Sequence, residues 1–447
     1  MNFIKELEWR GMIQDMTPGL EEELQKGNAK AYIGYDPTAS SLTIGNLVTI
    51  MLLKHLQLNG HTPIVLMGGA TGKIGDPSGK DAERKLLDFD IIDRNIEKFK
   101  KQFKKFLDFE GENAALILNN ESFYSDMDVF TFLRKIGKNI TVNYMMAKES
   151  VKNRIENRDQ GISFTEFSYQ IIQGYDFQYL FENEDCILQM GGSDQWGNII
   201  TGTHFVGKAG GKAFGLTCPL LTKSDGSKFG KSEGGNIWLD AEKTSPYQFY
   251  QFWINSVNNE DIPKMFKTFS LKSRSEIEEL LEEYHENNPQ HLLRVLAEEL
   301  TIRVHSHEVY ESVLKITEIM HNKKLHLDFL HNLSKEAYEM LGKEPNTLLF
   351  NSKEKMQDED ELTIGELLTS KGLPLDDFLV AGKVKDNGQK KINSKSDVRR
   401  AIKGNALSIN TIKAKEHNQL ITKNDLLHNR YIFIQNGKKD KFIAIIN

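Results

Sequence analysis

Short apolar runs alternate with segments of helical periodicity through the first half of the chain. The runs at 31–35, 62–68, 114–119 and 185–190 predict buried strands, and the first two end in Gly or Asp-Pro punctuation. Apolar residues recur at helical spacing in 45–58, and an amphipathic stripe runs through Ile92, Ile96, Phe99, Phe103 and Phe106. The alternation predicts an α/β fold at 1–222: a Rossmann-like parallel sheet with helices on both faces and a ligand site at the carboxyl ends of its strands.

The second half of the chain has a different pattern. Helical periodicity with Glu-rich turns covers 245–335 and predicts a small helical domain. A polar stretch without periodicity at 351–361 leads us to assign 336–360 to a linker. The tail at 361–447 predicts an α+β domain, with a short helix from Thr363, a helix at 394–403, a strand at 406–410 and a hairpin whose strands, 431–435 and 441–446, flank an Asn-Gly turn.

Length and composition exclude several classes of protein. The 447 residues correspond to about three domains at ~150 residues each. No apolar run approaches the ~18 residues of a membrane span, and the acidic N-terminus does not resemble a secretory signal. Two cysteines, Cys186 and Cys218, are too few for a disulfide framework or a Cys-based zinc site. We therefore expect a cytoplasmic protein that does not enter a membrane.

The charge is distributed unevenly along the chain. The whole chain has a net charge of −6, but residues 381–447 contain 15 Lys and Arg against 5 Asp and Glu, which leaves −16 for the remainder. Single Lys runs usually form a solvated surface, but an asymmetry of this size in a folded tail favours contact with a polyanion, and we expect nucleic acid.

Two glycine-rich segments resemble phosphate-binding P-loops without satisfying the pattern. Gly68-Gly-Ala-Thr-Gly-Lys73 has three residues between its glycines where four are needed, and Ile74 replaces the required Ser or Thr. The segment at 75–80 fails in the same way. We therefore do not expect a P-loop.

Two other segments are better candidates for phosphate chemistry. A strand ending at Asp36-Pro37 is followed by a helix starting near Gly45, whose free amides can hold an anion. Lys228 and Lys231 lie three residues apart on a Ser- and Gly-rich loop at 223–232, from which they can neutralise a polyphosphate. Taken singly, the first segment is also compatible with a plain strand-to-helix turn and the second with a solvated loop.

Taken together, these segments resemble the tyrosyl-tRNA synthetases of the bacterial, class I type. The helix-start segment is similar to the family's HIGH element, and Lys228-Phe-Gly-Lys-Ser232 is similar to its KMSKS element. The likeness runs from about Trp9 to the end of the chain and includes the segments 68–79, 161–169, 173–176 and 191–198. It implies a mobile KMSKS-type loop at 223–244, an anticodon-side role for 245–335 and a ribosomal-protein-like RNA-binding domain at 361–447.

The resemblance implies a two-step reaction. The carboxylate of L-tyrosine attacks the α-phosphate of ATP, giving tyrosyl-adenylate and pyrophosphate, and the terminal adenosine hydroxyl of tRNA(Tyr) then takes the tyrosyl group. Mg²⁺ accompanies ATP and is held mainly by phosphate oxygens, so we expect no protein ligand for it. The resemblance also implies a homodimer.

One face of a helix predicts where the amino acid binds. Tyr169, Gln173 and Asp176 are spaced i, i+4, i+7, and Asp176 can accept a hydrogen bond from a phenol to which Tyr32 donates another. The resemblance assigns tyrosine binding to Tyr32, Thr71, Asp76, Tyr169, Gln173, Asp176 and Gln195. It assigns ATP binding to Gly34, Asp36, Gly45, Asn46, Gly192, Asp194 and Lys231. It assigns catalysis to Thr38, Thr43, Asn46, Lys228, Lys231 and Ser232, and tRNA phosphate contacts to Arg399, Arg400 and Lys403. Without the family, most of these residues would be taken for satisfied polar side chains.

The sequence departs from the family at the HIGH element. Its first and last positions usually hold His but are Thr43 and Asn46 here. Asn46 retains a hydrogen-bond donor, whereas Thr43 is shorter and cannot be charged, so we expect a weaker contact with the terminal phosphate. The departure affects the expected rate and not the reaction.

Two alternatives remain. A tryptophanyl-tRNA synthetase shares the fold, but an indole has no hydroxyl for Asp176 and Tyr32 to bind. An RNA-binding or scaffold protein that has lost catalysis would explain Thr43, but it would not explain the intact segment from Lys228 to Ser232.

Overall fold

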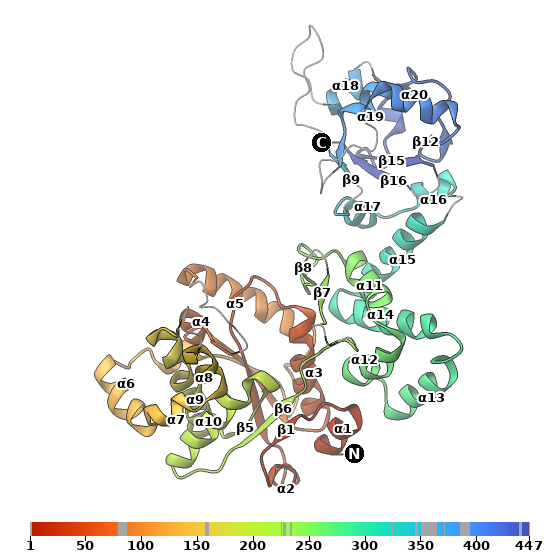
Figure 1. Cartoon of the computed structure of the whole chain (residues 1–447). Coiled ribbons are helices and arrows are strands. Elements are labelled where there is room, and N and C mark those ends of the chain that lie inside the picture. The colour runs from red at the N-terminus through yellow and green to blue at the C-terminus, as the bar shows by residue number, and fades with distance from the viewer. Residues whose placement is uncertain are drawn as a thin grey trace. The chain divides into compact units, whose positions relative to one another are not determined.

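The computed structural model describes residues 2–78, 87–156, 161–224, 226, 229–232, 235–322, 325–344, 347–349, 364–370, 372–384, 394–437 and 440–446. The chain divides into two compact units (Figure 1). Unit 1 comprises Met1–Lys243 and Phe252–Val304, and unit 2 comprises Thr244–Gln251 and His305–Asn447. None of the helices in these ranges is both long enough and apolar enough to cross a membrane.

Unit 1 is organised around a parallel sheet. Among its described residues the sheet has six strands in the order β1-β6-β5-β2-β3-β4. The strands are β1 (Asp15–Met16), β2 (Lys30–Tyr35), β3 (Thr62–Met67), β4 (Leu116–Asn119), β5 (Cys186–Gly192) and β6 (Phe214–Cys218). All neighbours are parallel except the edge strand β1, which pairs antiparallel with β6. The four strands expected from the apolar runs are confirmed as β2 to β5.

The chain reverses its direction of travel across the sheet between β2 and β5. It runs outward from β2 to β3 and β4, and then returns to the other side of β2 to form β5 and β6. The loops that follow β2 and β5 consequently lead away from each other. In open α/β sheets such a reversal leaves a crevice at the carboxyl ends of the two strands.

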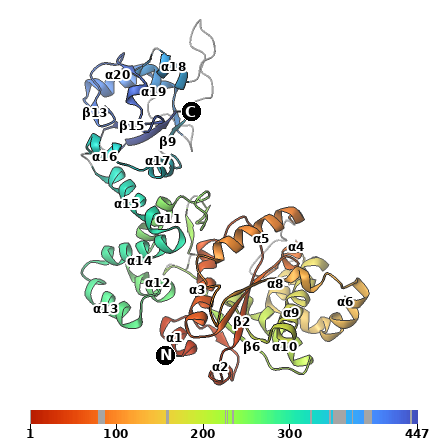
Figure 2. The same ribbon diagram turned by 180° about the vertical axis from the view of Figure 1, so that it is seen from behind.

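Helices cover both faces of this sheet (Figures 1 and 2). α3 (Ile44–Leu58) packs against β2, β3 and β5 on one face, and α9 (Phe164–Glu184) and α10 (Trp196–Lys208) pack on the other. The remaining helices around the sheet are α1 (Phe3–Arg10), α2 (Leu20–Leu24), α4 (Thr71–Ile74), α5 (Phe89–Phe103), α6 (Val129–Lys135), α7 (Val142–Met146) and α8 (Glu149–Glu156). The predicted stripe of α5 is confirmed, because its apolar members up to Phe103 are buried, and Phe106 is buried just beyond the helix end.

The alternation of side chains along β2 sets what each face receives. Tyr32 points to the α9 face, where its ring meets Phe177 edge-on at 5.3 Å between centroids. Tyr35 points to the other face and meets Phe103 of α5 at 4.7 Å. β2 therefore brings one tyrosine to each side of the crevice.

The helical segment expected at 245–335 is divided between the two units. α12 (Ile262–Phe269), α13 (Arg274–Tyr284) and α14 (Pro289–Val304) belong to unit 1, where α12 packs on α1 and α3. Arg10 of α1 donates to the carbonyl oxygens of Lys267 and Ser270, at 2.8 and 2.9 Å, and Arg303 donates to that of Phe269 at 2.7 Å. Two buried guanidinium groups thus cap the end of α12, a contact between distant segments that periodicity does not reveal.

Unit 2 contains the basic tail. In its described part, one sheet has the order β11-β9-β16-β15-β12-β13, and β10 pairs with β14. The strands are β9 (Thr347–Leu349), β10 (Leu373–Pro374), β11 (Lys383–Val384), β12 (Leu407–Ile409), β13 (Ile412–Lys413), β14 (Leu420–Ile421), β15 (Tyr431–Asn436) and β16 (Asp440–Ile445). The helices are α15 (His307–His321), α16 (Leu327–His331), α17 (Lys335–Leu341), α18 (Ile364–Ser370), α19 (Leu375–Ala381) and α20 (Lys395–Lys403), while α11 (Pro246–Asn255) spans both units. The predicted hairpin, strand and helices of the tail are confirmed.

The first part of the segment that we assigned to a linker is folded. Residues of α17 and β9 fall within 336–360, whereas 350–360 lie outside the described residues. β9 pairs in parallel with β16, and the ring of Tyr338 stacks on that of Tyr431 at 4.8 Å. The tail is therefore integrated with α15 to α17 within unit 2.

A buried lysine completes this integration. Lys441 of β16 donates its Nζ to the carbonyl oxygens of Ile319, Met320 and Asn322 at 2.5, 3.3 and 2.6 Å. These carbonyls lie at the end of α15, where a helix does not supply hydrogen-bond donors of its own, so the ammonium group caps the helix and complements its dipole.

Replacing this lysine should loosen α15 without touching unit 1. We expect Lys441→Met to lower the free energy of local unfolding at the end of α15 by about 2 kcal/mol, because hydrogen bonds from a charged donor to three carbonyls are lost. Hydrogen exchange of the α15 backbone measures this change. Lys413→Met, which removes an exposed lysine bonded to one carbonyl, is the matched control. Equal protection in both variants would contradict the capping role.

Candidate active site

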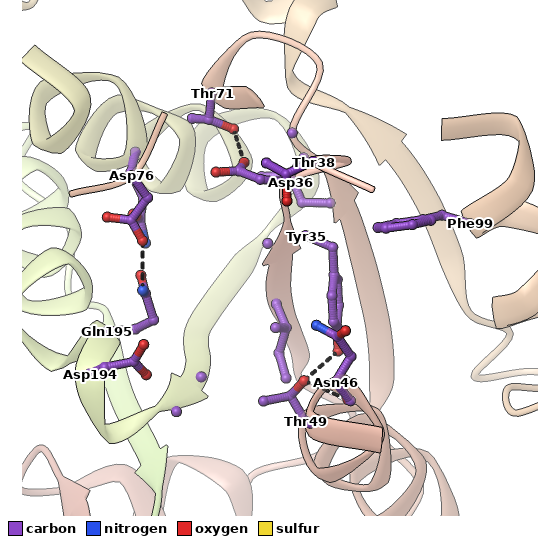
Figure 3. Close-up of a pocket in the computed structure, with 18 of the residues that line it drawn as sticks. Tyr35, Asp36, Thr38, Asn46, Thr49, Thr71, Asp76, Phe99, Asp194 and Gln195 are labelled. Atoms are coloured by element: carbon purple, nitrogen blue, oxygen red, sulfur yellow. Dashed lines mark hydrogen bonds between the residues drawn. The ribbon is translucent and has the colours of Figure 1, made fainter. Parts of the chain in front are cut away.

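A cavity of about 430 Å³ opens at the reversal point of the sheet in unit 1. Its walls come from the ends of β2 and β5, the start of α3, the turn after β3 and the buried face of α9. Figure 3 shows Asp76, Asp194 and Gln195 on one side and Tyr35, Asn46 and Thr49 on the other.

The cavity collects most of the side chains expected from the sequence. The lining residues include Tyr32, Gly34, Asp36, Thr38, Thr43, Gly45, Asn46, Thr71, Asp76, Tyr169, Gln173, Asp176, Gly192, Asp194 and Gln195. Lys231 and Ser232 form β7 (Lys231–Ser232), and Lys228 lies outside the described residues.

A carboxyl group forms part of the cavity wall. Asp176 Oδ2 accepts from the Asn120 amide at 2.9 Å, and Oδ1 accepts from the Tyr124 hydroxyl at 2.7 Å. Burial raises the pKa of Asp176 to about 7, the charge of Asp36 adds to the rise, and the two hydrogen bonds oppose it. Asp176 therefore changes charge near neutral pH in the free protein.

Three buried polar atoms of the cavity wall have no partner in the described structure. They are the Tyr32 hydroxyl and the Oε1 atoms of Gln173 and Gln189, and all three residues line the cavity. Tyr32 in β2 and Gln189 in β5 are register partners, so their side chains lie next to each other. Burial, together with the charge of Asp176, raises the pKa of Tyr32 well above its usual value, which keeps its hydroxyl protonated. Buried polar atoms without partners are costly, and here they are available to a ligand.

Asp36 links the turns after β2 and β3. Its Oδ1 accepts from the Thr71 hydroxyl at 2.6 Å (Figure 3). Its Oδ2 accepts from the Tyr169 hydroxyl at 2.8 Å. A Cβ at Gly68 would lie 2.1 Å from Asp36 Oδ1, so only glycine leaves room for this arrangement, whereas a Cβ at Gly34 would meet no atom within 4 Å. Asp36, which we expected beside the nucleotide, thus contacts two residues expected beside tyrosine.

A second carboxylate lies across the cavity. Asp76 Oδ2 accepts from the Gln195 amide at 2.8 Å (Figure 3). Its Oδ1 accepts from the Ser78 backbone N–H at 2.9 Å. Asn198 of α10 donates to Ser78 Oγ and Gln195 Oε1, both at 3.2 Å. These bonds hold Asp76 in one orientation facing the opening.

The departure from the HIGH pattern has a local structural role. Asn46 Oδ1 accepts from both the backbone N–H and the hydroxyl of Thr43, each at 2.9 Å, which forms a capping box at the start of α3. The Asn46 amide nitrogen points into the cavity (Figure 3). The Thr43 hydroxyl proton is donated to Asn46 Oδ1.

The predicted helix start and lysine loop meet at the cavity. β7 pairs with β8 (Gly235–Asn236), and Ile237 joins both sides by accepting from Ile44 N–H and donating to Gly230 O, at 3.1 and 3.0 Å. Asn236 and Trp238 line the cavity. The backbone that carries Lys231 therefore runs along the start of α3.

The charges of the lining are one-sided. The described residues that line the cavity include four aspartates, Asp36, Asp76, Asp176 and Asp194, and include no Lys or Arg. Nor do the described residues contain a group of three His, Cys, Asp or Glu side chains arranged to hold a metal ion. This lining favours an ammonium group, whereas a triphosphate needs cations from elsewhere.

The three candidate tRNA contacts lie on α20 in unit 2. Arg399 is within 4.0 Å of Asp376, Arg400 pairs with Asp397 but remains 78% exposed, and Lys403 is exposed at the helix end. Their side chains form one basic helix surface, partly neutralised by the two aspartates.

Sequence reasoning missed several lining or supporting residues, among them Asn120, Tyr124, Gln189 and Asn198. One signal was available for the first of these. Asn120 directly follows β4, and ligand sites in parallel sheets form at the carboxyl ends of strands.

Comparisons with known proteins agree with this geometry. Residues 24–322 match the model of the tRNA synthetases class I (W and Y), and residues 366–444 match the tyrosine–tRNA ligase SYY-like C-terminal domain. The chain is 46% identical to the tyrosine–tRNA ligase of Porphyromonas gingivalis over 451 residues, covering 100% of both chains. It is also 46% identical to that of Flavobacterium psychrophilum, covering 99% of each. A crystal structure of a C-terminally truncated mitochondrial tyrosyl-tRNA synthetase from Aspergillus nidulans is similar with a TM-score of 0.64 and 27% identity, covering 71% of this chain and 94% of that one.

The buried carboxyl group predicts a specific pH dependence of stability. Asp176 ionises near pH 3.9 in an unfolded chain, by a rough reference value, and at about 7 in the folded protein. The folded state therefore binds this proton more tightly, and the resulting stabilisation is complete below the unfolded pKa and lost as the pH rises through 7. We expect Asp176→Asn to lose less stability than the unmodified protein between pH 5 and 8, measured by thermal unfolding. Asp93→Asn, on the exposed face of α5, should follow the unmodified profile; parallel profiles for all three proteins would contradict the expectation.

Proposed function

The chain belongs to the class I tRNA synthetases, among the tyrosine–tRNA ligases, and we propose that the cavity of unit 1 is where it activates L-tyrosine with ATP. The enzyme joins tyrosine to tRNA. The identity of 46% over the whole chain to tyrosine–tRNA ligases argues against the tryptophanyl alternative.

One observation carries the proposed orientation of the substrate. The Tyr32 hydroxyl is buried and has no partner among the described residues, and it lies in the field of the Asp176 carboxyl group. A phenol placed between them accepts a hydrogen bond from Tyr32 and donates one to Asp176. An amino acid without this hydroxyl leaves the Tyr32 hydroxyl unpaired and removes one hydrogen bond to Asp176, so the arrangement selects tyrosine over phenylalanine.

We propose that the opposite end of tyrosine lies beside Asp76. This carboxylate faces the cavity, and with Tyr169 and Gln173 it offers acceptors for the α-ammonium group. Thr71 and Gln195 support the two carboxylates, Asp36 and Asp76, that flank this position. The negative lining suits a cationic amino group.

The nucleotide is proposed to lie along the edge formed by the ends of β2 and β5. Bare backbone at Gly34, Gly45 and Gly192 permits close approach of the adenosine, with Asp36 and Asp194 at its sides. The start of α3, at Gly45 and Asn46, is proposed to lie beside the phosphates. This placement uses the part of the cavity that tyrosine leaves open.

Cations must offset the aspartates when ATP binds. We propose that Lys228 and Lys231, with Ser232, Thr38 and Thr43, stabilise the pyrophosphate as it leaves. Mg²⁺ is proposed to arrive with ATP on its phosphate oxygens, and no protein ligand is assigned to it.

In the proposed reaction, a tyrosine carboxylate oxygen attacks the α-phosphorus, the bond from the α-phosphorus to the oxygen that bridges to the β-phosphate breaks, and pyrophosphate leaves. The tRNA terminal hydroxyl then attacks the tyrosyl carbonyl and releases AMP.

Amino-acid-dependent exchange between pyrophosphate and ATP tests this proposal. We expect tyrosine to support exchange, and phenylalanine or tryptophan to support it far less. Tyr32→Phe should reduce the preference for tyrosine over phenylalanine about tenfold, the effect of losing one hydrogen bond, and Asp176→Ala should reduce it further. Tyr179→Phe, on α9 but outside the cavity lining, should leave the preference unchanged.

Three results would oppose the proposal. An unaltered preference in both cavity variants would remove Tyr32 and Asp176 from substrate recognition. Exchange driven by tryptophan would favour the tryptophanyl alternative. If none of the amino acids tested supports exchange, the RNA-binding or scaffold protein that has lost catalysis would be favoured.

The basic surface of α20 is proposed to bind tRNA phosphates. Arg399, Arg400 and Lys403 lie on this helix, in the segment of the chain with 15 basic and 5 acidic residues. Such contacts orient the tRNA without reading bases. We accordingly propose 361–447 as the RNA-binding part of the chain and the helices of 245–335 as the anticodon side.

Charge reversal on α20 separates tRNA binding from tyrosine activation. For the double variant Arg400→Glu and Lys403→Glu we expect about a tenfold higher KM for tRNA and a salt dependence of affinity flatter by about two units of slope, with tyrosine-dependent exchange unchanged. Lys335→Glu, an exposed lysine of α17, is the control. An unchanged KM and slope would remove α20 from the tRNA surface.

We also propose a homodimer, formed through an apolar surface of unit 1. Exposed apolar side chains gather on α6, α7 and the first turn of α9: Val129, Phe130, Leu133, Val142, Met146 and Phe164. The inner sides of these helices share one core cluster that includes Ile136, Ile140 and Met145. Phe130 and Phe164 are 78% and 79% exposed, and a second copy of the same surface would cover them.

We also propose a cytoplasmic location, which fits the two free, buried cysteines.

Charges on this surface should separate the subunits. We expect the double variant Phe130→Glu and Leu133→Glu to be monomeric where the unmodified enzyme is dimeric, measured by sedimentation equilibrium. Leu314→Glu, which alters a half-exposed leucine of α15, should remain dimeric. A monomeric unmodified enzyme, or a dimeric double variant, would exclude this interface.

A further inference from the structure

A buried ion pair lies outside the cavity, at the start of the helix that carries Tyr169, Gln173 and Asp176. Arg154 of α8 and Glu166 of α9 have side chains that are only 3% and 1% exposed. Arg154 donates to Glu166 Oε2 from Nη2 at 2.9 Å and to Oε1 from Nη1 at 3.4 Å. The same guanidinium group donates from Nε and Nη2 to the Gly161 carbonyl oxygen, at 3.1 and 2.9 Å. Arg154 thus joins α8, the backbone before α9 and the first turn of α9.

Glu166 does not have the role that its sequence position indicates. It follows the N-cap Ser163 by three residues, and Ser163 Oγ accepts from the Glu166 backbone at 3.2 Å. A glutamate at this position usually returns its carboxylate to the N-cap backbone and completes a capping box. Here the carboxylate reaches Arg154 instead. The side chain therefore anchors the helix to a neighbouring segment.

Stability alone does not account for such a pair. Removing two charges from water is costly, and apolar residues of similar volume are often equally stable in the same place. What the ion pair adds is direction, because a planar guanidinium group bonded to a carboxylate and a carbonyl fixes the distance and rotation of the helix that carries the carboxylate.

The position of α9 matters for the cavity. Glu166 lies on the buried face of α9 together with Tyr169 and Asp176. Tyr169 is three residues further along, and its hydroxyl contacts Asp36 at 2.8 Å. A helix advances about 1.5 Å and turns about 100° per residue, while a hydrogen bond weakens beyond about 3.2 Å. A small slide or rotation of α9 would therefore misplace the side chains proposed to contact the substrate tyrosine. It would also misplace the hydrogen bond from Tyr169 to Asp36.

We infer that Arg154 is a positioning residue for the tyrosine pocket, acting through Glu166 on the placement of α9. It touches no substrate. The inference rests on the proposed function of Tyr169, Gln173 and Asp176. It predicts a larger effect on the binding of tyrosine than on the binding of ATP, since these three tyrosine contacts lie on α9 itself, whereas among the described residues α9 bonds to the proposed ATP contacts through Tyr169 and Asp36.

The test replaces both charges together, so that neither is left buried alone. We expect the double variant Arg154→Met and Glu166→Leu to fold with a Tm close to that of the unmodified enzyme. In pyrophosphate exchange its KM for tyrosine should rise about tenfold while its KM for ATP stays within about twofold, because only α9 loses its anchor. Glu166→Gln, which keeps the shape but not the charge, should raise the KM for tyrosine by a smaller factor. If the double variant does not fold, the KM of Glu166→Gln for tyrosine tests the inference.

A second Arg–Glu pair, which is partly buried, supplies the control. Arg303 and Glu299 on α14 have side chains 12% and 17% exposed and lie outside the cavity lining. Arg303→Met should lower stability without changing the KM for tyrosine. A tyrosine KM unchanged in both Glu166→Gln and the folded double variant would overturn the inference, as would an equal rise in the ATP and tyrosine KM values. Absence of tyrosine-dependent exchange in the unmodified enzyme would instead overturn the proposed function.

Discussion

The parallel pairing of β2 with β5 is the constraint on which the chemistry of unit 1 depends. These strands are distant in sequence but adjacent in the sheet, and their register sets Tyr32 beside Gln189. The chain leaves β2 toward α3 and leaves β5 toward α10, so the two connections separate and a cavity remains between them. Most of the proposed substrate contacts in unit 1 lie on these strands, on the loops that follow them or on helices that pack against them.

Within the cavity, the walls are held by internal hydrogen bonds, whereas the binding positions are incomplete. Asp36 is held by Thr71 and Tyr169, and Asp76 is held by Gln195. By contrast, Tyr32 and Gln189 have buried polar atoms without a partner in the described structure. Each such atom costs about 1–3 kcal/mol, which a correctly shaped ligand recovers when it binds. The cavity is therefore organised before the substrate arrives, and the energy of completing it is available for discrimination.

Electrostatics divides the chain into complementary parts. The cavity lining is acidic in the described structure, so ATP requires cations, which we propose come from the lysine loop and from Mg²⁺. The excess of basic residues lies in the tail of unit 2, where tRNA phosphates are proposed to bind. That tail is integrated into its unit, because Lys441 caps α15 and β16 pairs with β9. Lys441, which is buried, therefore helps to hold the basic tail against α15 within unit 2.

The amino-acid sequence by itself determined the elements and much of the candidate site. The apolar runs of β2 to β5, the stripe of α5, the tail hairpin and the helical spacing of Tyr169, Gln173 and Asp176 depend on neighbouring residues, so periodicity reveals them. Family resemblance added the residues around the cavity. Tertiary structure alone decided the order of the strands, the division of the helical segment at α14, the contacts of Asn120 with Asp176, and the choice of Arg154 over the helix cap by Glu166. These features are set by contacts between segments that are distant in the sequence, and one of these contacts replaces a local helix cap. Local periodicity carries no information about which distant group will come within hydrogen-bonding distance.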